Sequence, residues 1–275
     1  YRLLPNYSRF RTSIMSRAIL ELNHVTAGYG DIEVLHDVSL AVYPAEVIGI
    51  VGQSGSGKTS LLNCILQIEQ NLKVTSGEIL YLNQNLLTLN KKEYRRLFRD
   101  EISIIFQNSN FTLVPTRKIS SQFYETTKGR LTKEETRQKA YHLFEKFELK
   151  NPERIFHSYP FELSIGMAQR VAVSLALMNG PSLLLCDEPT SALDVKSAYE
   201  MVRQLKQLKE DKGMTMLVIT HNIALAAQLC DRIAVMHQGC IVEVQDTKTL
   251  IESPMHAYTK QLLAALPKTE DLWNG

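Results

Sequence analysis

The sequence predicts an α/β fold in which helices cover a parallel sheet, with an antiparallel β-layer ahead of it and a helical subdomain inserted into it. Three observations lead to this prediction. Short, continuously apolar strands alternate with helical segments after Pro181, as in buried parallel sheets. Apolar and polar residues alternate from position 18 to position 51, which is typical of half-buried antiparallel strands. Between about 90 and 178 the apolar residues recur mostly at helical spacing.

The β-layer and the sheet are each divided by recognisable turns. A further strand, residues 77–82, belongs with the alternating strands near the amino terminus. Continuous apolar strands are predicted at 183–186, 216–219 and 233–236. The turn residues that separate the first strands are Gly28, Gly30, Asp31 and Pro44.

The inserted segment carries a clear helix signal. Thr132 and Glu135 form a capping-box candidate, which predicts that a helix begins there. The apolar residues behind it recur on one helical face, at Ala140, Leu143, Phe144 and Phe147. We therefore expect a leader over 1–14, an α/β core over 15–106 and 179–248, a helical subdomain over 107–178, and a helical tail over 249–275.

Composition excludes several functional classes. The 275 residues carry a net charge of +2, which argues against a nucleic-acid partner held by sequence-independent electrostatics. The four cysteines lack metal-site spacing and have apolar neighbours, so we expect buried thiols of a reducing compartment: Cys64, Cys186, Cys230 and Cys240. Apolar runs stay below the ~20 residues that cross a bilayer, and we expect the chain itself not to span one.

Residues Gly52 to Thr59, GQSGSGKT, match the phosphate-binding pattern G-x-x-x-x-G-K-[ST] at every fixed position. An apolar strand precedes the motif and a helix follows, which favours a P-loop over a glycine-rich turn with an incidental lysine. Glycines let successive N–H groups face phosphate oxygens, where the helix N-terminus adds positive charge. Lys58 is predicted to reach the β- and γ-phosphates, and the Thr59 hydroxyl to ligate Mg²⁺. The predicted nucleotide-binding residues are Gly52, Gln53, Ser54, Gly55, Ser56, Gly57, Lys58, Thr59 and Ser60.

Two acids, Asp187 and Glu188, end the apolar strand 183–186. Adjacent carboxylates at the end of a buried strand are unfavourable without a cation nearby, so a surface turn is the less favoured interpretation. In P-loop ATPases the strand-end aspartate holds Mg²⁺, usually through water, and an adjacent glutamate polarises the attacking water. We therefore predict Asp187 as a Mg²⁺ ligand and Glu188 as the general base.

His221 and Gln107 follow two other apolar stretches. A lone histidine is usually structural, but one at the end of a core strand can reach the γ-phosphate side of such a site. Gln107 follows residues 104–106, and its amide is a candidate for the Mg²⁺ and water shell, with an ordinary surface glutamine as the alternative. We predict His221 as catalytic and Gln107 as a third metal-site residue beside Thr59 and Asp187.

An ordered set of motifs resembles the ATP-binding cassette (ABC) ATPases over about residues 18–248. The set comprises Tyr29, GQSGSGKT (52–59), Gln107, LSIGMAQR (163–170), LLLCDEPTSALD (183–194) and His221. The resemblance implies a P-loop ABC ATPase core, with ATP and Mg²⁺ as cofactors and Tyr29 stacked on adenine. It also implies that two cassettes dimerise head to tail, so that each site joins one chain's P-loop to the other chain's signature. Ser164 and Gly166 would then contact the partner's ATP, and Asp194 would lie at the dimer interface.

Two residues depart from the family pattern. Ile165 stands where the signature usually has the first of two glycines; it is tolerable there only at negative φ, and its bulk is expected to crowd the opposing phosphate. Hydrolysis at the site completed by this signature is therefore in question. Ala45 stands where a turn glycine is common, and we expect little consequence.

Two segments resemble the dipeptide, oligopeptide and nickel importer ATPases: residues 158–164 and the tail 253–267. That resemblance implies a subunit that couples ATP hydrolysis to uptake of peptides or nickel and other metal chelates. Its partners would be a second, non-identical ATPase, two permease subunits and an extracytoplasmic binding protein, and it would lie peripherally on the cytoplasmic face of the cell membrane. No cysteine follows Cys240, so no iron–sulfur centre is expected in the tail. The alternatives are a non-transport ABC protein of DNA repair or the ribosome, and an accessory subunit of phosphonate-cleaving machinery.

Overall fold

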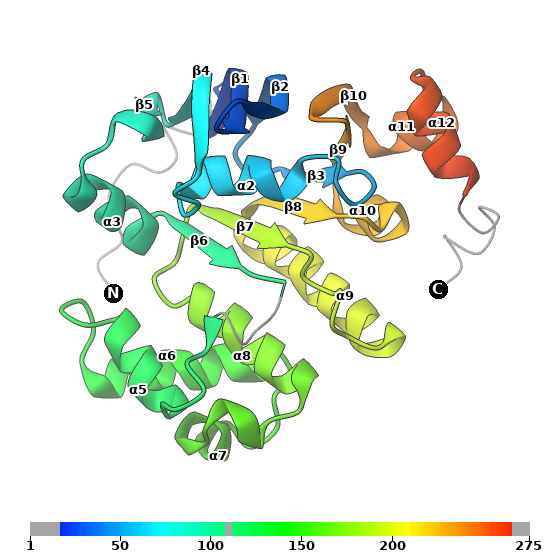
Figure 1. Ribbon diagram of the computed structural model, residues 1–275. Coiled ribbons are helices and arrows are strands. Elements are labelled where there is room, and N and C mark those ends of the chain that lie inside the picture. Colours follow the sequence, from blue (N-terminus) through cyan, green and yellow to red (C-terminus); the bar gives the residue numbers. More distant parts are fainter. Residues whose placement is uncertain (1–16, 108–111, 266–275) are drawn as a thin grey trace. The chain divides into compact units, whose positions relative to one another are not determined.

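The computed structural model describes residues 17–107 and 112–265, and the chain divides into two compact units (Figure 1). One unit comprises residues up to Asn90 together with those from Asp211 onward, and the other runs from Lys91 to Glu210. The predicted leader, residues 1–14, lies outside the described residues. The second unit, Lys91 to Glu210, extends beyond the helical subdomain predicted over 107–178. The limits of that subdomain stay a prediction.

The first unit contains the predicted antiparallel layer, with its strands in the order β2-β1-β4-β5. Both long neighbours of β1 run antiparallel to it. Along β1, buried apolar residues alternate with more exposed polar ones, as the sequence pattern predicts for a sheet with one packed face. The strands are β1 (Leu20–Tyr29), β2 (Ile32–Val42), β4 (Leu72–Tyr81) and β5 (Gln84–Asn85), followed by a 3₁₀ turn (Leu86–Thr88).

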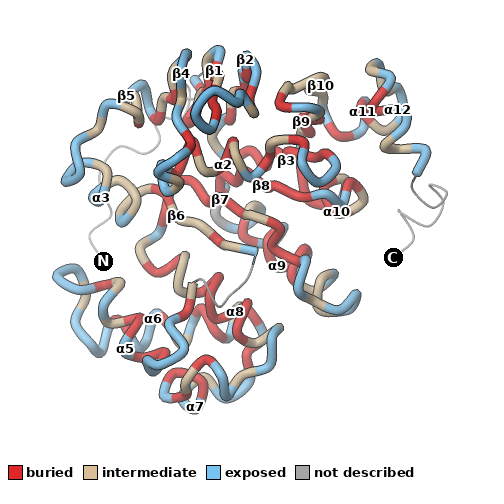
Figure 2. Tube along the Cα trace, in the orientation of Figure 1, coloured by how far each residue is buried: buried red, intermediate tan, exposed pale blue. Residues whose placement is uncertain are grey.

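Four further strands of this unit are ordered β10-β9-β3-β8. β3 (Val47–Val51) pairs in parallel with both β8 (Thr215–Thr220) and β9 (Arg232–His237), and its five residues are all buried (Figure 2). The predicted parallel sheet also has an antiparallel edge strand that was not predicted, because β10 (Cys240–Asp246) pairs antiparallel to β9. Its sequence, CIVEVQD, is mostly half-buried and lacks the continuous apolar run of its neighbours.

Four helices belong to the first unit as well: α2 (Lys58–Leu66), α10 (Ile223–Leu229), α11 (Thr247–Glu252) and α12 (Ala257–Ala264). α2 follows β3 and packs against β2 and β4 of the antiparallel layer. α10 packs against β3 and β8, and the short α11 packs against the β9–β10 hairpin. The nucleotide loop predicted from the sequence therefore lies between a parallel strand and a helix that contacts the β-layer.

The second unit joins a two-stranded parallel pair to a set of helices. β6 (Ile102–Ile105) pairs with β7 (Leu183–Asp187), so the stretch predicted as mostly helical also supplies a strand. The helices are α3 (Lys91–Asp100), α5 (Ile119–Thr126), α6 (Lys133–Lys146), α7 (Pro152–His157), α8 (Ile165–Ala176) and α9 (Val195–Lys212), with a 3₁₀ turn (Pro160–Glu162) before α8. The last two residues of α9 fall in the first unit.

The helices of the second unit pack around aromatic side chains. Phe123 of α5 meets Phe144 of α6 and Phe156 of α7 edge to face, with ring centroids 5.4 and 5.9 Å apart. The capping box that begins α6 is confirmed: the Thr132 hydroxyl accepts the Glu135 N–H at 3.2 Å, and the Glu135 carboxylate accepts the Thr132 N–H at 2.7 Å. The helical period read from the sequence thus identified real core positions.

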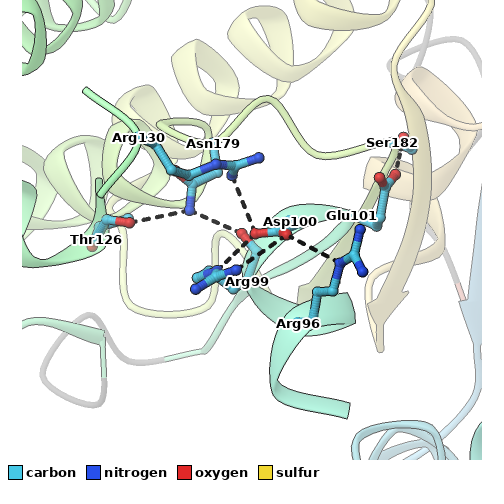
Figure 3. A network of polar contacts seen from close by, with 8 residues as sticks. All are labelled: Arg96, Arg99, Asp100, Glu101, Thr126, Arg130, Asn179 and Ser182. Carbon is cyan, nitrogen blue, oxygen red and sulfur yellow. Dashed lines mark hydrogen bonds and ion pairs between the residues drawn. The ribbon is translucent and has the colours of Figure 1, made fainter. Parts of the chain in front are cut away.

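A polar network around Asp100 fixes the end of α3 (Figure 3). The Asp100 carboxylate accepts a hydrogen bond from Arg99 at 2.8 Å and lies 3.3 Å from Arg130. These guanidinium groups, the Arg99 hydrogen bond foremost, hold the pKa of Asp100 below its usual range. The Asn179 amide donates to the carbonyls of Arg99 and Thr126 (Figure 3), which ties the loop before β7 to α3 and α5.

The thiol prediction was wrong for one cysteine. Cys64, Cys186 and Cys230 are buried, but Cys240 is partly exposed at the start of β10. Burial raises the pKa of Cys64 to about 12 and also raises the pKa of Cys186, so both thiols stay protonated. In the described parts of the chain, every helix is too short or too polar to cross a membrane.

Candidate nucleotide-binding site

The loop between β3 and α2 has the backbone of a phosphate cradle. Gly55 and Gly57 adopt left-handed conformations, with φ of 80° and 104°, which side-chain-bearing residues rarely adopt. A Cβ atom on Gly52 would lie 2.2 Å from the carbonyl oxygen of Met236 on β9, so only glycine fits there. The loop therefore needs glycine for both its curvature and its close packing.

Lys58 is the first residue of α2 and is only 7% exposed. Its ammonium donates hydrogen bonds to the carbonyl oxygens of Gly52 at 2.7 Å and Gln53 at 2.9 Å, and approaches the Ser56 hydroxyl at 3.4 Å. The first turn of α2 has no acidic residue, and its N-cap, Gly57, offers no side chain to its N–H groups. A helix start without a side-chain cap and with an adjacent ammonium is suited to an anion.

Two other segments of the first unit contact this loop. The carbonyl oxygen of Ser56 accepts the N–H of Gly239, in the turn between β9 and β10, at 2.9 Å. A Cβ on Gly57 would lie 3.1 Å from Leu35 of β2, so the antiparallel layer also touches the loop. Tyr29 ends β1 opposite Ile32, at the beginning of the same β2 strand, and is 37% exposed.

His221 lies at the same edge of the parallel strands as the loop. In the β3–β8 pair Val51 stands opposite Thr220, so Gly52 and His221 each follow their strand at adjacent positions. Parallel neighbours are ~4.8 Å apart, which places the two backbones side by side. The Thr220 hydroxyl accepts the N–H of Asn222, whose own side chain caps α10, so the segment that carries His221 is held on both sides.

The second unit brings Gln107, Asp187 and Glu188 together at one strand edge. Ile105 of β6 stands opposite Cys186 of β7, and all three residues follow these partners. Glu188 is 9% exposed and has a left-handed backbone, with φ of 46°. Such a conformation is costly for a glutamate and is retained mainly where the surroundings enforce it, as at functional sites.

The signature segment forms the start of α8 in the same unit. The Ser164 hydroxyl accepts the N–H of Met167 at 3.3 Å and caps the helix. Ile165 has a helical backbone, so its φ is negative, as an isoleucine at this position requires. Its side chain is 63% exposed. A Cβ on Gly166 would lie 3.7 Å from the Ser197 hydroxyl of α9, so α8 and the start of α9 adjoin there. The Asp194 carboxylate accepts the N–H and hydroxyl of Ser197 and caps α9.

One contact to the loop was missed by sequence reasoning. The Tyr258 hydroxyl, on α12, accepts the backbone N–H of Gln53 at 3.0 Å. The two residues are 205 positions apart, and a local sequence pattern gives no signal for such a pair.

Comparison with known proteins settles the family. The model of the family described as "ABC transporter" matches residues 35–191, more than half of the chain. The chain belongs to the ABC transporter family. Dipeptide transport ATP-binding protein DppD of Caldanaerobacter subterraneus subsp. tengcongensis is 36% identical over 241 residues, which cover 86% of this chain and 74% of that protein. Methionine import ATP-binding protein MetN 1 of Enterococcus faecalis is 36% identical over 250 residues, 89% of this chain and 68% of that protein.

A solved structure agrees with the fold of this ABC protein. It is a dimeric post-hydrolysis state of the ATP-binding cassette MJ0796 bound to ADP and Pi, with a TM-score of 0.72 and 32% identity over 83% of this chain and 98% of that chain. The predicted α/β fold of an ABC ATPase is thereby confirmed, as is the enzyme class: the chain is an ATPase of a transporter and binds ATP.

Each unit carries oxygen donors of the kind that Mg²⁺ takes. In the first unit Thr59 lies exposed in the first turn of α2, and in the second unit Gln107 follows β6 and Asp187 ends β7. Hydroxyl, amide and carboxylate oxygens are the ligands that Mg²⁺ prefers, with phosphate oxygens and waters completing its shell. When bound, the ion would neutralise charge on the β- and γ-phosphates.

Proposed function

We propose that this ABC ATPase is the nucleotide-binding subunit of an importer for peptides. The observation that supports the cargo class most directly is the 36% identity to a dipeptide transport protein over 86% of the chain. The lead-in 158–164 and the tail from Ser253 resemble the same importer group. Identity alone does not select the cargo, because the methionine import protein is equally similar.

We propose these roles at the ATP site. The N–H groups of Gly52–Gly57 cradle the phosphates, and Lys58, placed by the carbonyls of Gly52 and Gln53, meets the β- and γ-oxygens. Tyr29 stacks on adenine. Thr59, Gln107 and Asp187 hold Mg²⁺, the last through water, while Glu188 takes a proton from the attacking water and His221 contacts the γ-phosphate side.

A second cassette would complete each site. Ser164 and Gly166 at the start of α8 would face the γ-phosphate of ATP bound to the partner, where the helix N-terminus stabilises negative charge. Two permease subunits and an extracytoplasmic binding protein are the other proposed partners, with the ATPase peripheral to the cytoplasmic face of the membrane. ATP-driven closure of the two cassettes would move the permeases, and hydrolysis would reset them.

Co-purification and uptake test this function together. A tagged full chain is expressed in its own cells, the associated proteins are identified, and ATP-dependent uptake of a labelled dipeptide is measured in inverted or reconstituted vesicles. We expect two hydrophobic permeases to co-purify, and Lys58→Ala to lower both ATP binding and uptake by at least about tenfold, because a charge-assisted phosphate contact is lost. Lys73→Ala, at an exposed position of β4, serves as the matched control.

Two results would contradict the proposal. Recovery of a soluble enzyme complex or nucleic acid in place of permeases would rule out an importer. Permeases with full uptake of a nickel chelate and none of a dipeptide would keep the importer and change its cargo.

A further inference from the structure

The carboxyl-terminal helix is joined to the nucleotide loop through Gln53. The N–H of Gln53 donates to the Tyr258 hydroxyl at 3.0 Å, and the carbonyl oxygen of Gln53 accepts the Lys58 ammonium at 2.9 Å. One loop residue is thus bonded on one side to the tail and on the other to the phosphate-binding lysine. A shift of Tyr258 therefore turns the peptide that joins Gly52 to Gln53, and the carbonyl oxygen of that peptide, from Gly52, also accepts the Lys58 ammonium, at 2.7 Å.

The ring of Tyr258 is itself fixed against the strand that borders the loop. Tyr258 is 7% exposed and stacks on His237, the last residue of β9, with ring centroids 3.9 Å apart and planes 24° apart. The preceding residue, Met236, supplies the carbonyl that packs against Gly52. The hydroxyl is therefore presented to Gln53 from a buried, stacked ring.

A buried carboxylate on β10 holds the chain that leads into α12. Glu243 is 6% exposed, and its two oxygens accept the N–H groups of Met255 at 2.8 Å and His256 at 2.9 Å. Burial alone would raise the pKa of Glu243, but these N–H donors, together with Thr259 and Gln245, hold the pKa below its ordinary value. The His256 ring then accepts the N–H of Tyr258 at 3.2 Å and caps α12.

We propose that Tyr258 is a positioning residue for nucleotide binding, through which docking of the tail sets the ATP affinity of this chain's own P-loop. The proposal rests on the ATP-binding role given above to Gly52–Thr59. Tyr258 acts through the N–H of Gln53: its hydroxyl orients the Gly52–Gln53 peptide, whose Gly52 carbonyl holds the Lys58 ammonium. Docked, the tail keeps the loop preorganised, so less order must be gained when the phosphates bind.

Tyr258→Phe tests this by removing the hydroxyl while keeping the ring on His237. In the purified full chain, the Kd for MgATP is measured by titration calorimetry, and the melting temperature is measured separately. We expect MgATP to bind about three- to tenfold more weakly, the range for one intramolecular hydrogen bond, with a melting temperature within about 2 °C of wild type. In the assembled transporter KM for ATP should rise by a similar factor with kcat within about twofold.

Two further variants separate the possible outcomes. Tyr43→Phe removes a hydroxyl elsewhere in the same unit, from a ring beside Arg232, and should leave the Kd unchanged. Glu243→Gln replaces one acceptor oxygen by a donor facing an N–H, so it should loosen the tail and weaken MgATP binding in the same direction as Tyr258→Phe. If the Phe variant does not fold, the Gln variant decides.

Kd values within about 1.5-fold of wild type in the folded variants would overturn the positioning role, since even a weak hydrogen bond changes an equilibrium by more. Full MgATP binding by Lys58→Ala would instead overturn the P-loop assignment, so the two failures are distinguishable.

Discussion

Two helix starts in this protein are predicted to face phosphate, and they are built in opposite ways. α2 begins behind a loop whose glycines pack against β9 and whose lysine is 7% exposed and bonded to loop carbonyls. α8 begins after Ser164, whose hydroxyl caps the helix, and the Ile165 side chain is 63% exposed. Both helices lack acidic residues in their first turn, so both leave the positive end of the dipole uncompensated.

The difference indicates where each site is completed. The surroundings of α2 come from segments of its own unit, namely β2, the β9–β10 turn and α12. The start of α8 instead exposes apolar side chains, as does the adjoining start of α9, where Val195 is 89% exposed. Exposed apolar groups beside a helix N-terminus are typical of an interaction surface. Binding should therefore depend on α2 of the same chain, and turnover on residues of the second unit and a partner.

Glu188→Gln gives the largest effect and separates these two dependences. The amide keeps the size of the side chain but cannot take a proton from water, so we expect steady-state ATPase activity of the assembled transporter to fall at least about 100-fold. MgATP binding should stay within about twofold of wild type, because the groups that hold the phosphates are unchanged. Phosphate release and calorimetric titration measure the two quantities.

Glu210→Gln, at an exposed position of α9, is the matched control and should change neither quantity. Equal losses of MgATP binding and turnover in Glu188→Gln would contradict the separation of binding from turnover, since the carboxylate would then contribute to nucleotide binding. Unchanged turnover would remove Glu188 from the base role.

Ile165→Gly tests whether α8 acts on a partner's nucleotide. The side chain is exposed within its own chain, so its removal should leave MgATP binding by this chain unchanged. In the assembled transporter we expect ATPase activity to rise roughly two- to fivefold, the effect of relieving about 0.5–1 kcal/mol of crowding in the transition state. Ile165→Val, which keeps the β-branch, should give little gain. Equal activity of all three proteins would mean that the isoleucine is tolerated.

The sequence predicted the elements that obey local rules. The P-loop motif required a strand and a helix around it, and β3 and α2 lie where that context placed them. Thr132 and Glu135 form a capping box because a helix start needs acceptors for its free N–H groups. The strand-end positions of Asp187 and His221 followed from the buried apolar runs before them.

What the sequence could not supply was long-range or conformational. Tyr258 reaches Gln53 only because α12 folds back onto the β9–β10 hairpin, a contact without a local pattern. β10 was missed because its burial is partial and its pairing antiparallel. The left-handed backbone of Glu188 also could not be predicted from the sequence, because glutamate has no preference for that conformation.

Ala45 offers the smallest but cleanest test, because it shares the left-handed backbone of Glu188 without a proposed role. The expectation of little consequence for function at this position stays a prediction, but the residue has a φ of 59°, where a Cβ costs energy that glycine avoids. Its N–H donates to the Thr215 hydroxyl at 2.9 Å, which holds the turn before β3 in place. The strain therefore lies in the structural support of the P-loop strand.

We expect Ala45→Gly to stabilise the protein by about 0.5 kcal/mol, since relief of the strained backbone exceeds the extra chain entropy of glycine in the unfolded state. Denaturant unfolding measures the change, and ATP affinity and turnover should not move. Gly213→Ala is the reverse control: φ there is 59° as well, so adding a Cβ should destabilise by about 1 kcal/mol. Destabilisation by Ala45→Gly would show that the turn tolerates alanine without cost. The left-handed backbone of Glu188 would then be weaker evidence of a functional role, because the same conformation would carry no energetic cost at Ala45.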